Sequence, residues 1–133
     1  MIDKVLEGFC EKHLPPAQYG ALTLAYIGDC VYELYVRSHL ISDRDHKVNE
    51  LHKTATKYVC AGAQAALFRR IEGLLTDEEL DIFRRGRNTK SQVPKNADMQ
   101  DYRAATGMEA LIGYLYLQGE TERMTALLAH IFD

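Results

Sequence analysis

The amino-acid sequence predicts an all-α fold of about six helices, and three observations support this. Apolar residues recur with a period close to that of an α-helix over most of the chain. No segment shows a convincing alternation of apolar and polar residues, which is the pattern of a half-buried strand. The three prolines stand at positions 15, 16 and 94, which leaves long stretches free to be helical. With 133 residues, 47% of them hydrophobic, the chain can bury its own core, and 1–133 is expected to be one domain.

The first half of the chain is expected to begin with a short helix over 3–12, which Pro15 and Pro16 prevent from continuing. A long helix follows over 19–41. Apolar residues occupy most of its sides, so we expect it to lie at the centre of the fold rather than half in solvent. The Ser-Asp-Arg-Asp sequence at 42–45 is typical of a turn.

A second long helix is expected over 48–71, with alanine and leucine on one face and Gly73 ending it. Thr76 and Glu79 then have the spacing of a capping box, in which the hydroxyl and the carboxylate close the start of a helix. The helix that begins there is expected to run to about Arg85.

The last third of the chain begins with a basic loop over 86–96, which contains glycine and proline. An apolar helix is expected over 98–117, with Gly119 ending it. A final helix over 121–132 closes the chain.

The bulk charge does not suggest a nucleic-acid-binding protein, since the formal net charge is −3 and the sequence pI is about 5.9. The distribution of charge suggests the opposite. Residues 82–97 contain five cations and no acid, so an acidic body has one basic segment.

The cysteines, Cys10, Cys30 and Cys60, are widely spaced and form no C-x-x-C motif, which disfavours a disulfide framework and a zinc site. We expect them to be buried free thiols in a reducing cytoplasm. The N-terminus lacks the pattern of a signal peptide, and charged residues interrupt the most apolar region, 21–41. A cytoplasmic protein without a membrane span is therefore expected.

Two carboxylates, Asp29 and Glu109, lie within the two most apolar of the expected helices. Acidic side chains are seldom buried unless they are paired or bind a metal. If the two helices pack together, both carboxylates face one hole, and hard oxygen ligands of this kind suit Mg²⁺. The alternative is that each carboxylate is paired with an arginine or capped by a hydroxyl.

A glycine accompanies each of these carboxylates, Gly28 directly before the first and Gly107 two residues before the second. A glycine within a helix indicates that something approaches closely, either a ligand or a second helix. Glu33 follows the first carboxylate by one helical turn, and we expect it to pair with its own i+4 neighbour, Arg37.

The basic segment is rich in groups that donate hydrogen bonds to phosphate oxygens. It contains no aromatic residue that could stack on unpaired bases, so the backbone of a duplex fits it better than single-stranded nucleic acid. A solvated loop that offsets acidic neighbours is the alternative. The candidate RNA-binding residues are Arg84, Arg85, Arg87, Asn88, Lys90 and Lys95.

Other chemistries find no support in the sequence. The five histidines show no H-x-x-x-H ligand pair and are expected to lie on the surface or to have ordinary partners. Neither a phosphate-binding G-x-x-x-x-G-K-[ST] loop nor a G-x-S-x-G nucleophile motif is present, which disfavours a nucleotide-driven motor and a serine hydrolase.

Two blocks of the sequence resemble the endonuclease domain of the ribonuclease III family. Residues 26–34, Tyr-Ile-Gly-Asp-Cys-Val-Tyr-Glu-Leu, are similar to its signature, which reads roughly aromatic-aliphatic-Gly-Asp-Ala-Val-aliphatic-Glu. Residues 109–116, Glu-Ala-Leu-Ile-Gly-Tyr-Leu-Tyr, are similar to its second block. The resemblance extends from about Tyr19 to Glu122.

Three shorter segments resemble the subclass called Mini-ribonuclease III. They are residues 51–59, 85–91 and 94–96, and they occur in the order and spacing of that subclass.

The resemblance implies an all-α homodimer that cleaves double-stranded RNA with Mg²⁺, its two active sites cutting opposite strands. The catalytic and metal-binding carboxylates of the family map onto Asp29 and Glu109. The bound metal would polarise the scissile phosphate and activate a water, which leaves a 5′-phosphate and a 3′-hydroxyl. The subclass implies that the substrate is precursor large-subunit (23S) ribosomal RNA, and a ribosomal protein on that RNA is a further candidate partner.

Two positions depart from the larger ribonucleases III. Ala25 stands where they have a glutamate, and Thr106 stands where they have an aspartate. Waters or substrate oxygens must therefore complete the coordination of the metal. No double-stranded-RNA-binding domain is expected in this chain, so the dimer cleft and the basic segment must hold the duplex, and binding should be weak and sensitive to salt.

A second hypothesis is a binding module, in which an inactive domain of this kind docks on structured RNA or ribosomal particles. The two missing carboxylates favour it. The two that remain, Asp29 and Glu109, favour the enzyme, because a scaffold has no reason to desolvate them. A helical protein-interaction domain unrelated to RNA is the third hypothesis.

Overall fold

The computed structural model describes residues 14–90 and 92–133, and within these ranges the fold is all-α, as predicted, with no strand. The helix expected over 3–12 lies outside the described residues. The described elements are η1 (Pro16–Gln18), α2 (Ala21–Leu40), α3 (Val48–Val59), α4 (Ala61–Ile71), η2 (Glu72–Leu74), α5 (Asp77–Asn88), α6 (Met99–Leu117), α7 (Thr121–Leu128) and η3 (Ala129–Phe132). None of these helices is both long enough and apolar enough to cross a membrane.

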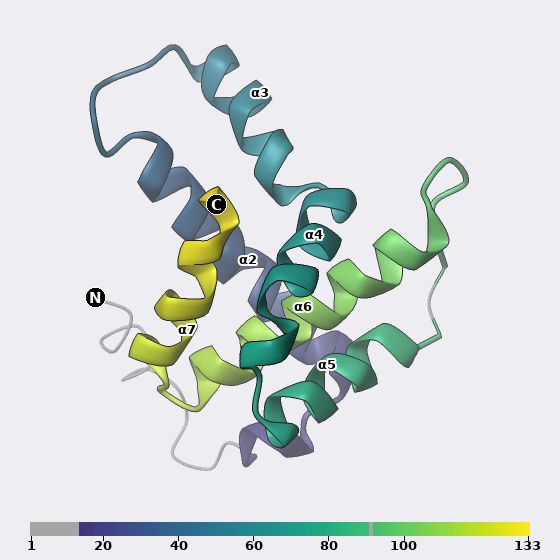
Figure 1. Ribbon diagram of the computed structural model, residues 1–133. Coiled ribbons are helices and arrows are strands. Elements are labelled where there is room, and N and C mark those ends of the chain that lie inside the picture. The colour runs from purple at the N-terminus through teal and green to yellow at the C-terminus, as the bar shows by residue number, and fades with distance from the viewer. Residues whose placement is uncertain (1–13, 91) are drawn as a thin grey trace.

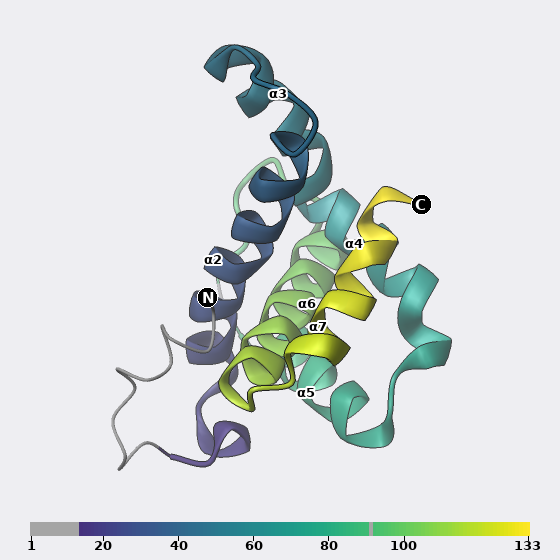
Figure 2. The same cartoon turned by 90° about the vertical axis from the view of Figure 1, so that its left-hand side faces the viewer.

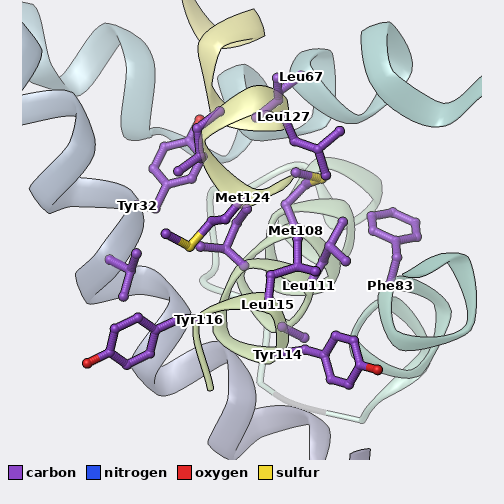
Figure 3. Close-up of a cluster of buried hydrophobic side chains, with 14 of the residues drawn as sticks. Tyr32, Leu67, Phe83, Met108, Leu111, Tyr114, Leu115, Tyr116, Met124 and Leu127 are labelled. Carbon is purple, nitrogen blue, oxygen red and sulfur yellow. The ribbon is translucent and has the colours of Figure 1, made fainter. Parts of the chain in front are cut away.

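Helix α6 is the centre of the bundle, with α2, α4, α5 and α7 packed around it (Figure 1, Figure 2). Every residue from 110 to 116 is buried, because α6 is apolar on all sides. Side chains from α2, α5 and α7 close the core around it (Figure 3). The rings of Phe68 and Phe83 stack in this core, with centroids 3.6 Å apart.

The expectation that the 19–41 helix is central was wrong. One side of α2 is buried, but the other side exposes a row of large apolar residues. We call this row the α2 stripe; it consists of Leu22, Tyr26, Leu34 and Ile41. Apolar residues all round a helix are compatible with a central position in one chain or with a second contact at an interface, and the sequence pattern does not separate these cases.

The helix expected over 48–71 is two helices, because the backbone at Cys60 is extended, with φ −65° and ψ 160°. Side chains satisfy two carbonyls at the end of α3. The hydroxyl of Tyr32 donates to the carbonyl of Tyr58 at 2.9 Å, and the amide of Gln64 donates to the carbonyl of Val59 at 3.0 Å. Helix α4 joins the core, whereas α3 projects along the end of α2 and has no buried residue (Figure 1).

Helix α5 begins at the capping box that the sequence predicts and ends later than expected, at Asn88 instead of about Arg85. Gly86 belongs to this helix and lies where the backbones of α5 and α6 come close together. A Cβ on Gly86 would stand 2.8 Å from the Cα of Gly107. The first part of the expected 86–96 loop is therefore helical. Gly119 ends α6 with φ 74°, which confirms the expected stop signal.

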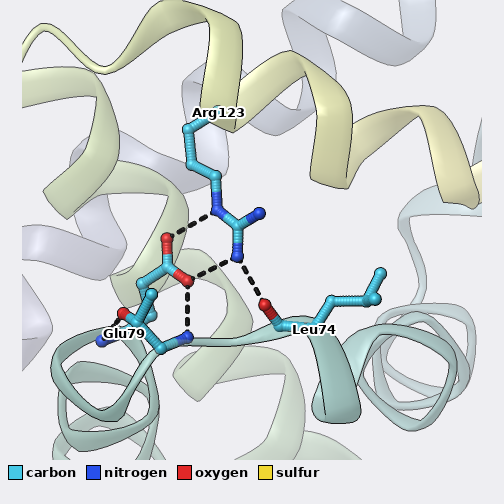
Figure 4. Close-up of polar contacts among 4 residues, drawn as sticks. Leu74, Glu79 and Arg123 are labelled. Atoms are coloured by element: carbon cyan, nitrogen blue, oxygen red, sulfur yellow. Dashed lines mark hydrogen bonds and ion pairs between the residues drawn. The ribbon is translucent and has the colours of Figure 1, made fainter.

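An ion pair between the half-buried guanidinium of Arg123 and the buried carboxylate of Glu79 ties α7 to the start of α5. The guanidinium of Arg123 donates to both carboxylate oxygens of Glu79, at 2.9 and 2.8 Å, and to the carbonyl of Leu74 at 2.6 Å (Figure 4). Arg123 is the largest cause that lowers the pKa of the Glu79 carboxyl, and the hydrogen bond from the backbone of Thr76 adds to it. This pair fixes the connection between α4 and α5.

The expectation of buried thiols is wrong for two of the three cysteines. Cys30 and Cys60 are both exposed free thiols. Cys10 lies outside the described residues. Cys30 is on the side of α2 that faces away from the core, and Cys60 is at the break between α3 and α4.

Candidate active site

The crossing of α2 and α6 is built on glycines. A Cβ on Gly28 would overlap the carbonyl oxygen of Glu109, and one on Gly113 would overlap the carbonyl oxygen of Leu24. Gly28 is therefore explained by helix packing, one of the two readings that the sequence left open. Gly107 is explained in the same way, since its Cβ would stand 2.7 Å from the ring of Phe83. The contacts of Gly28 and Gly113 bring the backbones of α2 and α6 directly against each other.

This crossing brings Asp29 and Glu109 together. Both line one open cavity of about 520 Å³ between α2 and α6, Asp29 from its exposed side and Glu109 from a half-buried position. Burial is the largest cause that raises the pKa of Glu109, and together with the hydrogen bond and negative charge of Asp29 it brings this pKa to about 8. Without a cation between them, the charged form of Glu109 is disfavoured beside the second carboxylate.

Neither carboxylate has the ordinary partner that was the alternative explanation. No Lys, Arg or His lines the cavity, and no ion pair of Asp29 or Glu109 occurs in the part of the chain that the structure describes. Glu33 lines the cavity too, but it pairs with Arg37 at 2.8 Å, as expected. Among the described residues, these two carboxylates therefore have no positively charged side chain as a partner in the cavity.

The donor set fits a hard divalent cation that keeps several waters. Mg²⁺ is commonly bound by one or two carboxylates together with substrate phosphate oxygens. No group of three or more His, Cys, Asp or Glu side chains that could hold a metal occurs in residues 14–90 and 92–133. Asp29 and Glu109 are the two described carboxylates that could hold such a cation, and the open side of the cavity leaves room for water and phosphate.

Ala25 and Thr106, the two positions at which the larger ribonucleases III have carboxylates, line this same cavity. Both are buried. The hydroxyl of Thr106 donates to the carbonyl of Tyr102, one turn earlier in α6, at 3.1 Å. The departures in sequence therefore fall on the wall of the candidate site, where they remove negative charge.

The candidate RNA-binding residues do not form one loop. Arg84, Arg85, Arg87 and Asn88 belong to the last turns of α5, whereas Lys90 and Lys95 lie between α5 and α6. Arg84, Lys90 and Lys95 are exposed, and no ion pair involves them among the described residues.

Two of the arginines have contacts within the fold. Arg85 donates to the carbonyls of Ala17 at 2.8 Å and Tyr19 at 2.7 Å, so it ties η1 to α5. Arg87 lies over the ring of Phe83, 5.8 Å from its centroid, and donates to the side chain of Asn88 at 3.2 Å. The structure thus gives Arg85 a structural role that the sequence did not predict.

Sequence reasoning missed two groups of residues. Tyr26 and Tyr102 line the carboxylate cavity, although the sequence analysis gave neither a role in the site. Lys53 and Lys57 form an exposed cationic row on α3, the helix that projects from the bundle (Figure 2). Their i, i+4 spacing was the available signal.

Comparisons with known proteins agree with this geometry. The family model described as the Ribonuclease III domain matches residues 22–120, which include both carboxylates and the basic segment. A crystal structure of a Fusobacterium nucleatum protein has the same fold, with a TM-score of 0.77 and 28% identity over 84% of this chain and 90% of that one.

Curated relatives are more similar still. Mini-ribonuclease 3 of Desulfitobacterium hafniense is 55% identical over 80% of this chain and 68% of its own length. Mini-ribonuclease 3 of Thermoanaerobacter is 48% identical over 96% of this chain and 94% of its own length. The chain therefore belongs to the Mini-ribonuclease 3 group of the ribonuclease III family, and its activity is that of a ribonuclease III-type endoribonuclease.

Proposed function

We propose that this protein is a Mg²⁺-dependent endoribonuclease that cuts double-stranded RNA, and that Asp29 and Glu109 hold the metal. The observation that carries the proposal is the pair of carboxylates in one cavity that is lined by no Lys, Arg or His of the described residues. Desolvation of Glu109 beside the negative charge of Asp29 costs stability unless a cation binds between the two groups.

The residues of the site have defined tasks. A bound Mg²⁺ would polarise the scissile phosphate and lower the pKa of a coordinated water, so that hydrolysis leaves a 5′-phosphate and a 3′-hydroxyl. Glu109 must lose its proton before it can act as a ligand, and its raised pKa makes metal binding favour higher pH. Ala25 and Thr106 leave space on the wall for water or phosphate oxygen.

A dimer completes the binding surface in this proposal. The α2 stripe is an exposed apolar surface on a 133-residue chain, and it continues into an apolar groove of about 440 Å³ between α2 and α3. A stripe of this kind on a soluble domain marks a contact surface. We infer that a second copy of the chain covers it, through a two-fold contact in which α2 meets α2.

The RNA duplex then lies across both active sites. The exposed cations Arg84, Lys90 and Lys95 are the candidate contacts to its phosphates, and Lys53 and Lys57 add exposed charge on α3. Few phosphates are contacted, so binding is weak and falls steeply with salt. We propose precursor large-subunit (23S) ribosomal RNA as the natural substrate, with a ribosomal protein on that RNA as a further partner.

The alternative is an inactive module that binds structured RNA, and one observation favours it: Ala25 and Thr106 leave the cavity two carboxylates short of the larger enzymes. A cleavage assay decides between the two. Wild-type protein and Asp29→Asn are each mixed with long double-stranded RNA, with Mg²⁺ or with a chelator.

Cutting that needs Mg²⁺ and is lost in Asp29→Asn supports the enzyme. A gel shift with no cutting by the wild-type protein supports the binding module. Single-stranded RNA of the same sequence is the control for substrate class. Equal cutting of both RNAs contradicts the specificity proposed here.

A further inference from the structure

The cavity around Asp29 and Glu109 has many acceptors and few donors. Of the ten described residues that line it, none is Lys, Arg or His, and three are acidic. The RNA backbone is an anion, and besides a metal it needs hydrogen-bond donors to hold it in register. Among the described residues, the oxygen donors on this wall are three hydroxyl groups, those of Tyr26, Thr106 and Tyr102.

Two of the three hydroxyl-bearing residues have other roles. Thr106 donates to the carbonyl of Tyr102 at 3.1 Å and is buried. Tyr26 is 83% exposed and belongs to the α2 stripe, which the proposed dimer covers. Tyr102 is half-buried, and its hydroxyl has no hydrogen-bond partner among the described residues.

The position of Tyr102 connects the two surfaces that the proposed function requires. It precedes Glu109 by seven residues, which is two turns on the same face of α6 and about 10 Å along the axis. It also follows the N-cap of α6, Asp98, by one turn, and the basic segment 82–97 ends just before that cap. An RNA strand that runs from the carboxylates to the basic segment passes over Tyr102.

We propose that the Tyr102 hydroxyl donates a hydrogen bond to a backbone phosphate of the RNA next to the scissile one, and so fixes the register of the strand in the cavity. This inference rests on the proposed endonuclease function and adds to it a substrate-positioning residue. Tyr102 carries no charge, so its contribution is independent of salt, unlike that of the cations.

The test is Tyr102→Phe, which removes the hydroxyl and keeps the ring. KM for a double-stranded RNA should rise about five-fold, the value of one neutral hydrogen bond, with kcat within two-fold of wild type. The slope of log(kcat/KM) against log salt and the melting temperature should both stay unchanged. Tyr35→Phe is the matched control, because Tyr35 is also half-buried but lies outside the cavity, and it should leave KM unchanged.

Several results would overturn the inference. An unchanged KM in Tyr102→Phe, a fall in kcat alone, or an equal rise in KM in Tyr35→Phe would each do so. A lower melting temperature that explains the loss would show a structural role instead. The wild-type protein separates this inference from the proposed function: if it cuts while Tyr102→Phe is unaltered, only the inference fails, and if it does not cut, both fail.

Discussion

Gly28 lies directly against the backbone of Glu109, and no side chain fits between them. A Cβ on Gly28 would overlap the Glu109 carbonyl oxygen and stand 2.7 Å from the amide nitrogen of Gly113. The next residue, Asp29, is thereby held beside the Glu109 carboxyl group. One glycine thus sets both the packing of the two longest helices and the distance between the candidate metal ligands.

Gly28→Ala should lower the free energy of unfolding by about 3 kcal/mol, because the backbone of α6 cannot give way to the added methyl group. Urea denaturation measures this. Gly73→Ala is the control, since a Cβ there would meet nothing within 4 Å, and it should change stability by less than about 0.5 kcal/mol. Similar losses in the two variants would contradict the close crossing.

The metal-free protein should become less stable as pH rises. The folded-state pKa of Glu109 is about 8 against a reference of 4.5, so between these values the folded protein keeps a proton that the unfolded chain has lost. The unfolding free energy therefore falls from about pH 4.5 to pH 8 and then levels off. Thermal melts with chelator check this.

Glu109→Gln should flatten this pH dependence and raise the stability at pH 8 by about 1 kcal/mol or more. Adding Mg²⁺ at pH 8 should stabilise the wild-type protein and not Glu109→Gln. A wild-type melting temperature that rises between pH 5 and pH 8 in chelator would contradict the raised pKa of Glu109.

Arg123→Ala should lower the free energy of unfolding by about 3 kcal/mol, because it leaves the buried carboxylate of Glu79 without its partner. Arg37→Ala is the matched control. It breaks an ion pair of the same 2.8 Å length with Glu33, but that pair is exposed, and its loss should cost less than about 0.5 kcal/mol. Equal effects in urea denaturation would show that the Glu79 pair contributes no more than a surface pair.

The exposed cations should differ from Arg85 in their effect on RNA binding. Arg84→Ala and Lys90→Ala should each reduce the slope of log affinity against log salt by about one unit, with no change in melting temperature. Arg85→Ala should instead lower the melting temperature, since it removes two hydrogen bonds to backbone carbonyls. Unaltered slopes in Arg84→Ala and Lys90→Ala would move the RNA surface elsewhere, with Lys53 and Lys57 the next candidates.

The dimer is tested by Tyr26→Arg, which places a charge in the middle of the α2 stripe. Light scattering at micromolar concentration should give about twice the 15.1 kDa chain mass for the wild-type protein and the chain mass for Tyr26→Arg. Leu74→Arg is the control, because Leu74 is also exposed but is outside the stripe. A monomeric wild-type protein would refute the proposed dimer.

Local sequence signals predicted most of the elements. The capping box at Thr76 and the glycine stop at Gly119 are local, and both are where the sequence placed them. The ion pair of Glu33 with Arg37 was also predictable, because its two members lie on one helical turn. The break at Cys60 was not, since no proline marks it and one of the carbonyls before it, that of Tyr58, is satisfied by Tyr32, which is distant in sequence.

The sequence by itself determined the all-α class, the family and the two carboxylates, because each is written in a local pattern of residues. The tertiary structure decided that α6 and not α2 is central, that one side of α2 is exposed, and that Arg85 binds backbone carbonyls instead of remaining free. These facts depend on which helices touch, and a helix that is apolar on all sides does not specify its neighbours. The shared cavity of Asp29 and Glu109 likewise exists only because Gly28 and Gly113 let two helices cross at backbone contact.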